Sequence, residues 1–376
     1  MTTAVRPRPT VGIRLGVVAL FLANGAGFGA WAASIAAVKQ NLGLSAGELG
    51  GALLCVAFGA MLAMPVAGWL GARHVRRLLT WTGVLFMLAL PWPGFVDSLP
   101  LLAASLLVVG AGAGSLDVCM NARAAEVERG WGQPIMSSFH AAFSLGALAG
   151  AGLVALSAWL GWGVPGGLLA TSALLAVAVA AHLALDPSPD LAAPGTRMAW
   201  PSRAVAGIGA LCLLGFMSEG AVADWSGVFL FQVAGFSPPA ATSGLAAFSG
   251  AMVAARLGGD RVVRRFGPVW VLRAGGLGAA AGFLLAMAVP AAGPVGFGLV
   301  GLAVANMAPI LFSAAGSAGP AASTGVAAVA TLGYAGMLLG PPVIGVLADY
   351  LGLRLALGVL VAAVLGIALG AGRAAR

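Results

Sequence analysis

Six polar side chains that could bind a solute or a proton interrupt long apolar stretches of this sequence. They are Asn24, Asp117, Asn121, Glu219, Asp224 and Asn306. Amide or carboxyl groups at membrane depth are costly, and such positions commonly mark solute or proton pathways. Asp117 and Asn121 are four residues apart, so they share one face of a helix. The set favours recognition of a small polar solute.

Glu219 is the strongest candidate for a proton-binding group. It lies near the middle of an apolar stretch over 204–231 and has no basic residue close in sequence. A carboxyl at that depth could load and release a proton as a cavity opens to each side in turn. The alternative is a structural Glu satisfied by a neighbouring helix. Asp224, five residues on, lies on another face and is the weaker candidate.

Other candidate side chains have an ordinary structural explanation as well. Asp117 and Asn121 could instead bond to Arg123 or to another arginine near the cytoplasmic end of their helix. His140 could shuttle protons, because imidazole titrates near neutral pH, or could make an interhelical hydrogen bond. Trp31 and Trp225 could stack on a sugar-like ring, although packing or interface anchoring is commoner for such residues. His182 is expected to be solvated near a cytoplasmic helix end.

Composition identifies the surroundings of these groups as a lipid bilayer. Of 376 residues, 60% are apolar and 8% are charged, and the mean hydropathy is +1.01. Soluble domains are about 45–50% apolar and about 25% charged. The sequence therefore indicates a polytopic membrane protein and excludes soluble, disordered and fibrous chains. The net charge of +8 is explained by basic residues flanking membrane spans, so no nucleic-acid partner is expected.

Twelve apolar helices are predicted, which makes the fold class all-α. They lie near 12–37, 47–71, 77–96, 99–122, 134–159, 164–185, 204–231, 239–258, 268–290, 293–314, 320–347 and 352–372. With the N-terminus inside, 17 of the 19 Lys and Arg residues, Arg256 among them, fall on the cytoplasmic side. Only Lys39 and Arg354 fall outside. This asymmetry predicts that both termini are cytoplasmic.

A polar linker divides the chain into two similar halves. Residues 1–185 and 204–376 are predicted as six-helix bundles joined by a cytoplasmic linker over 186–203. The sequence Gly71-Ala-Arg-His-Val-Arg-Arg77 recurs as Gly259-Asp-Arg-Val-Val-Arg-Arg265, 188 residues later. Repeated halves of this kind are typical of secondary transporters.

The residues after the eighth span resemble the loop signature of the major facilitator superfamily. Val263 replaces the second Gly of that signature, and Ala72 replaces its Asp in the first copy. The Gly/Pro-rich segment 336–345 is also similar to that superfamily. The segments 117–121 and 134–146 resemble its MosC-like branch, near the fucose-permease type.

This resemblance implies roles for particular residues. Spans 1, 4, 7 and 10, which hold the six polar side chains, would line a central cavity. The two arginine-rich loops would gate its cytoplasmic side. Their residues are Gly71, Arg73, Arg76, Arg77, Gly259, Asp260, Arg261, Arg264 and Arg265.

The function expected is secondary transport of a small polar solute, such as a sugar, by alternating access. Coupling to protons is favoured over another ion, and a drug or metabolite efflux antiporter is the alternative. Remote alternatives are a non-transporting sensor and an intramembrane hydrolase using Ser137 or Ser138 with His140. No metal or other cofactor is expected. We expect a monomer in the cytoplasmic membrane of a bacterium.

Overall fold

The computed structural model describes residues 10–44, 46–187, 202–241, 243–318 and 322–375. These residues form helices and connecting turns, with no strand in the described ranges. They divide into two compact units, of which the first comprises 1–199 with 319–327 and the second 200–318 with 328–376. Most of the predicted linker over 186–203, with Arg6 and Arg8, lies outside the described residues.

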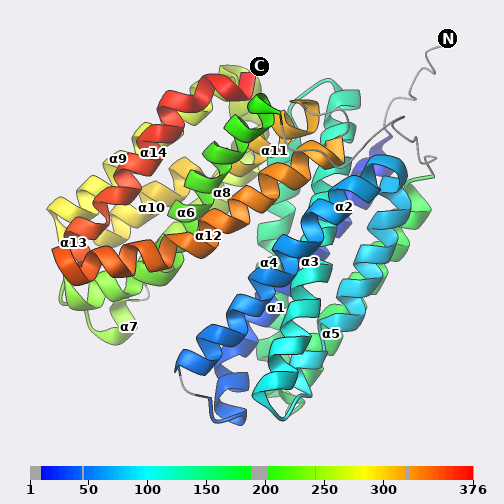
Figure 1. Ribbon diagram of the computed structural model, residues 1–376, viewed down its shortest axis with the longest axis horizontal. Helices are drawn as coiled ribbons and strands as arrows, with labels where there is room; N and C mark the ends of the chain where they lie inside the picture. The colour runs from blue at the N-terminus through cyan, green and yellow to red at the C-terminus, as the bar shows by residue number, and fades with distance from the viewer. Residues whose placement is uncertain (1–9, 45, 188–201, 242, 319–321, 376) are drawn as a thin grey trace. The chain divides into compact units, whose positions relative to one another are not determined.

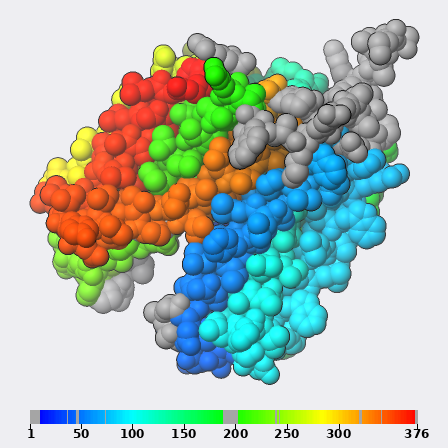
Figure 2. Space-filling model, in the orientation of Figure 1, coloured from blue at the N-terminus to red at the C-terminus, as the bar shows by residue number. Residues whose placement is uncertain are grey.

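Long helices build the first unit, drawn from blue to green in Figure 1. Its elements are α1 (Val11–Asn41), α2 (Ala46–Ala89), the 3-10 helix η1 (Trp92–Gly94), α3 (Leu99–Trp131), α4 (Met136–Trp159) and α5 (Gly163–Leu185). The helix α2 continues through a kink at His74, where φ is −142° and ψ is 48°. In Figure 2 the side chains of α2 cover much of the face of this unit that is turned to the viewer.

The second unit contains more helix breaks than the first. Its longer elements are α6 (Arg203–Gln232), α8 (Ser243–Phe266), α9 (Pro268–Ala288), α10 (Gly293–Val304), α11 (Met307–Ala318), α14 (Gly358–Gly370) and, from residue 328 on, α12 (Ala322–Leu351). The shorter ones are α7 (Pro238–Ala241), η2 (Pro290–Ala292), α13 (Leu353–Ala356) and η3 (Ala371–Ala375).

The helices give the twelve spans of the predicted fold class. In the described part of the chain, ten helical segments are long and apolar enough to cross a membrane. They include Glu48–Ala72 and the continuous stretch Pro290–Ala318. The remaining spans are the second part of α2, beyond His74, and α8, which carries Arg256 and further charges. The two units are pseudo-symmetric six-helix bundles.

Glycines bring the first and fifth spans of each half into backbone contact. A Cβ on Gly146 would collide with the Leu22 carbonyl on α1, and one on Gly25 with the Phe143 carbonyl on α4. In the second half, 190 residues after Gly146, a Cβ on Gly336 of α12 would collide with the Leu213 carbonyl on α6. Since lipid gives helices no hydrophobic drive to associate, such close approach supplies much of the attraction.

The arginine-rich segments predicted as loops are helical. Residues 71–77 belong to α2, and residues 259–265 lie within α8, which ends only at Phe266. The turn to α9 is a single residue, Gly267, whose φ of 80° is left-handed and suits glycine. The helices therefore continue past the ends of the predicted spans, because basic residues can extend a helix without interrupting it. The second span, predicted to end at 71, agrees with the apolar segment Glu48–Ala72.

The arginine assigned to the outer side has a structural role. Arg354 donates from Nε to the Met287 carbonyl at 2.5 Å and from Nη2 to the Ala288 carbonyl at 3.2 Å. These carbonyls belong to the last turn of α9, where backbone acceptors have no partner within the helix. A cation there also complements the helix dipole.

Candidate functional site

A buried polar cluster in the first unit joins α3 to α4. Asn121 Nδ2 donates to Asp117 Oδ1 at 3.1 Å and to the Asp117 carbonyl at 2.9 Å. His140 Nε2 lies 3.2 Å from Asn121 Oδ1, so this pair requires a proton on Nε2. All three side chains are buried. The shared helix face expected from the spacing of four residues thus places Asp117 and Asn121 in direct contact.

Asn24 and an aromatic contact extend this cluster to α1. Asn24 Nδ2 lies 3.7 Å from the Met120 sulfur, and the Phe21 ring packs edge-on against His140 with centroids 5.4 Å apart. Asn24 is buried. The glycine contacts between α1 and α4 set the separation that lets Phe21 reach His140.

The structure corrects the alternative explanation offered for Asp117. Arg123 does not bond to Asp117, because its Nε and Nη2 donate to the Asp186 carboxylate at 2.8 and 2.9 Å. The helix α3 also runs to Trp131, nine residues beyond its predicted end at 122. Asp117 therefore lies well inside the helix, and Asn121 is its side-chain partner among the described residues.

The Arg123–Asp186 contact anchors one end of the first unit. Arg76 Nε donates to the Asp186 carbonyl at 2.6 Å, which ties α2 to the end of α5. Asp186 is fully buried, although the sequence placed it in the polar linker. His182, predicted to be solvated, is also fully buried, and neither of its ring nitrogens is hydrogen-bonded within the described residues. The prediction failed because α1 covers this end of α5: a Cβ on Gly16 would lie 3.3 Å from the His182 Cα.

In the second unit a buried arginine of α8 lies near a half-buried carboxylate of α6. Arg256 Nη2 lies 4.0 Å from Glu219 Oε1, and Arg256 Nε donates to the Ala305 carbonyl at 3.1 Å. The Arg256 side chain is 8% exposed and that of Glu219 is 27% exposed. Arg256 was grouped with the basic residues that flank the span, but it is buried within α8, ten residues before the end of that helix.

Sequence reasoning overlooked Arg256 because it is grouped in sequence with the arginines that follow it. Two signals could have identified it. A carboxyl near the middle of a span calls for a cation on a neighbouring helix. Pro309, which has no N–H, leaves the carbonyl four residues before it without its helical donor, and that carbonyl belongs to Ala305.

Asn306 lies beside this pair, at the break between α10 and α11. It is buried, and its Oδ1 accepts no hydrogen bond from the described residues. An orphaned buried carbonyl oxygen is rare and costs about 1–3 kcal/mol, so it is a natural acceptor for a solute hydroxyl. A cavity of ≈ 10 Å³, lined in part by Glu219, Cys212 and Met307, has roughly the size of one water molecule.

The remaining candidates lie in varied settings. Trp31 is buried in α1, and Trp225 is half-buried, 3.3 Å from the position of a Cβ built on Gly345. Asp224 is exposed. Arg261, Arg264 and Arg265 are exposed along the end of α8, whereas Gly71 and Gly259 are buried within α2 and α8.

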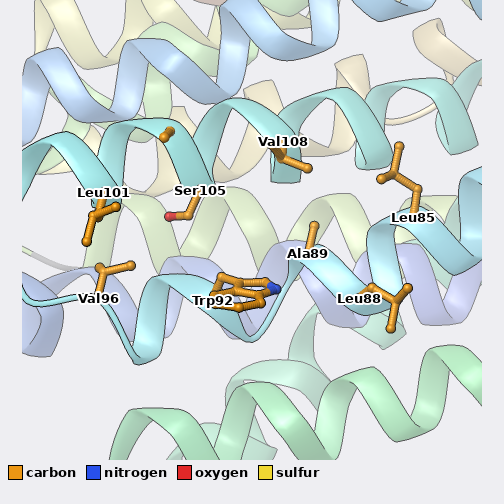
Figure 3. Close-up of a pocket in the computed structure, with 9 residues that line it drawn as sticks. Leu85, Leu88, Ala89, Trp92, Val96, Leu101, Ser105 and Val108 are labelled. Atoms are coloured by element: carbon orange, nitrogen blue, oxygen red, sulfur yellow. The ribbon is translucent and has the colours of Figure 1, made fainter.

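A larger hollow on the first unit is not the polar site. A groove of ≈ 350 Å³ lies between the end of α2, η1 and the start of α3, and its lining includes Leu88, Trp92, Leu101 and Ser105 (Figure 3). The Ser105 hydroxyl donates to the Leu102 carbonyl within its own helix. With this hydroxyl bonded inside its own helix, the walls of the groove are apolar, and such walls suit lipid chains better than a polar solute.

The hydrolase alternative gains no support from the geometry. Ser137 and His140 are both buried on α4, but no hydrogen bond joins them in the described part of the chain. The Ser138 hydroxyl donates to the Ile135 carbonyl and accepts from Arg14. A nucleophile activated by histidine requires direct contact, and among the described residues no hydrogen bond supplies it between Ser137 and His140.

Comparison with known proteins gives a consistent family. The family model described as Major Facilitator Superfamily matches residues 17–334. An uncharacterized MFS-type transporter of Yersinia pestis is 39% identical, with 91% of this chain and 90% of the relative covered. Membrane protein MosC of Rhizobium meliloti is 34% identical, with 90% and 84% covered. The solved structure of the E. coli fucose:proton symporter FucP is similar at a TM-score of 0.75 and 16% identity, covering 96% of this chain and 98% of that one.

Proposed function

Because the chain belongs to the Major Facilitator Superfamily, we propose that it couples transport of a small polar solute to protons. It is a multi-pass membrane transporter with bacterial relatives, and the resemblance read from its motifs is confirmed. A sugar or polyol is the proposed solute class. The fucose:proton symporter FucP, which has a similar fold, supports the choice of this solute class.

The observation that carries this proposal is the Glu219–Arg256 pair. Arg256 Nη2 lies 4.0 Å from Glu219 Oε1, and the Arg256 side chain is buried. A carboxyl near the middle of a span, beside an arginine of a neighbouring helix, is suited to linking proton movement to solute arrival or to a change of access state.

The first-unit cluster is proposed to recognise the solute. Asn24, Asp117 and Asn121 present amide and carboxyl groups suited to hydroxyls. Within the second unit, Asn306 is proposed on its own as a hydroxyl acceptor. His140 holds the Asn121 amide in place. Because an amide does not titrate, Asn121 passes no proton between His140 and Asp117, so we assign His140 to orientation. Trp31 and Trp225 remain candidates for stacking, and Asp224 is the weakest candidate for proton coupling.

Two measurements test the proposal. Purified protein is screened by thermal shift against sugars, polyols, amino acids and cationic drugs, beginning with fucose. A ligand at 100 times its Kd stabilises the fold by about 2.7 kcal/mol. The hits are then tested in proteoliposomes with an imposed pH gradient. Accumulation of a sugar or polyol with inward proton flow supports symport, and drug accumulation by proton exchange would replace the proposal with efflux antiport.

A further inference from the structure

The helix break in span 10 has a chemical cause four residues away. Pro309 has no N–H, so the Ala305 carbonyl loses the donor that an uninterrupted helix would provide. The helix α10 ends at Val304 and α11 begins at Met307. Helical bonding resumes at once, because the Ile310 N–H donates to the Asn306 carbonyl at 3.2 Å. Within this stretch, Pro309 thus opens one specific backbone acceptor.

Arg256 occupies that acceptor. Its Nε donates to the Ala305 carbonyl at 3.1 Å, and the residue is 6% exposed. The guanidinium is planar, so fixing Nε also fixes the direction of the remaining nitrogens. Nη2 lies 4.0 Å from Glu219 Oε1. One side chain therefore serves a backbone carbonyl and a carboxylate together.

Close helix packing brings Arg256 within reach of α10. A Cβ on Gly301 would collide with the Phe248 carbonyl of α8. Gly301 lies one turn before Ala305, and Phe248 lies about two turns before Arg256. The helices α8 and α10 are in backbone contact near the freed Ala305 carbonyl, so the Arg256 side chain can reach that carbonyl directly from α8.

We propose that Pro309 is a positioning residue for proton coupling: the carbonyl that it opens holds Arg256 against Glu219. The effect on proton coupling rests on the proposed function. The arrangement of Pro309, the Ala305 carbonyl and Arg256 does not depend on transport. Lysine at position 256 could not replace arginine, because one ammonium lacks the two-sided fork that spans carbonyl and carboxylate.

Hydrogen–deuterium exchange tests the geometry without any solute. Arg256→Met removes the donor, so the peptide spanning 305–312 should exchange about tenfold faster than in the unaltered protein. Pro309→Ala supplies a new N–H at position 309 that can bond to the Ala305 carbonyl. When Arg256→Met is added to Pro309→Ala, hydrogen exchange of the 305–312 peptide should change less than twofold. If Arg256→Met accelerates this exchange equally with and without Pro309→Ala, the inference is overturned.

Transport in proteoliposomes tests the consequence, with fucose as the first probe. Pro309→Ala and Arg256→Lys should each lower pH-driven accumulation about tenfold while leaving the KM for exchange within twofold. The double variant should be no worse than the poorer single variant, because both changes act through one contact. The positioning role would be refuted if the losses from the two single variants multiplied in the double variant. Unchanged accumulation in Pro309→Ala would also refute it.

The matched control is Pro65→Ala in α2, another proline within a spanning helix. It should leave the exchange of 305–312 unchanged. One outcome is that the effect of Arg256→Met on hydrogen–deuterium exchange depends on Pro309 as expected, while no solute accumulates in response to a pH gradient. In that case the contact geometry is supported and the proposed function fails. If accumulation is pH-driven but the two changes act independently, the function stands and the role of Pro309 fails.

Discussion

In the first unit a buried carboxyl is bonded to a neutral amide, whereas in the second a carboxylate faces a buried arginine. Loading a proton on Asp117 would remove the charge of that group and leave no partner uncompensated. Loading one on Glu219 would remove the negative charge that lies 4.0 Å from Arg256 Nη2. The same protonation step thus alters a contact with a neutral amide in one half and a contact with a buried cation in the other. This asymmetry suits a division between solute recognition and coupling.

The packing beneath the two sites is nearly the same. Gly146 and Gly150 of α4 approach the carbonyls of Leu22 and Ala26 on α1. Gly336 and Gly340 of α12 approach α6 in the corresponding way. Duplicated backbone contacts therefore support different side-chain chemistry, which indicates that the scaffold and the site can vary separately.

The largest effect is expected from filling this shared packing. Gly146→Leu and Gly336→Leu should each destabilise the fold by about 3 kcal/mol or more, because the new side chain meets backbone and not a movable side chain. The measurement is the yield of monodisperse protein in detergent. Gly152→Leu on α4 is the control, since no heavy atom lies within 4 Å of its Cβ position. Normal yield of either packing variant would show that the halves do not depend on these contacts.

The next effect separates the two carboxyls. Glu219→Gln keeps size and hydrogen-bonding capacity but cannot bind a proton, so pH-driven accumulation should fall at least about tenfold while exchange of labelled solute continues. Asp117→Asn should weaken exchange itself, because Asp117 belongs to the proposed recognition cluster. Both activities are measured in the same proteoliposomes. If Glu219→Gln still concentrates solute, the coupling role passes to Asp117 or His140.

A smaller effect is expected from breaking the hydrogen-bonded chain of the first unit. Asn121→Ala removes the contacts to Asp117 and His140, so the KM for exchange should rise about fivefold to tenfold without loss of coupling. Thr171→Ala is the control, since this buried hydroxyl bonds to the Gly167 carbonyl of its own helix. A loss of accumulation with unchanged KM would place coupling in the first unit and reverse the comparison.

Much of the architecture could be predicted because hydropathy and arginine distribution report directly on the bilayer. The positions of the spans and the half-length repeat follow from these signals alone. Within the first-unit site, the Asp117–Asn121 contact was predictable because it is local in sequence and depends on helical spacing.

The contacts that were missed join residues far apart in sequence. Arg256 reaches Ala305 across 49 positions, and Arg123 reaches Asp186 across 63. An arginine near a basic cluster cannot be distinguished from its neighbours by charge alone, because its burial depends on which helix packs beside it. His182 was misassigned for the same reason: covering by α1 is a property of the tertiary fold.

The smallest effect should come from the exposed arginines at the end of α8. Asp260 is the one acidic residue within 259–265, and Arg261, Arg264 and Arg265 beside it are exposed. Asp260 itself is half-buried. Because interactions of a carboxylate with exposed arginines contribute only about 0.2–1 kcal/mol, Asp260→Asn should slow transport about twofold to fivefold while solute binding is preserved. Initial uptake rate and thermal shift measure the two properties, with Asp97→Asn as an exposed acidic control in the first unit. Because salt screens such charges, the difference between Asp260→Asn and the unaltered protein should shrink as ionic strength rises. A difference that is independent of salt, or lost solute binding, would mean that Asp260 acts inside the site and not as part of a gate.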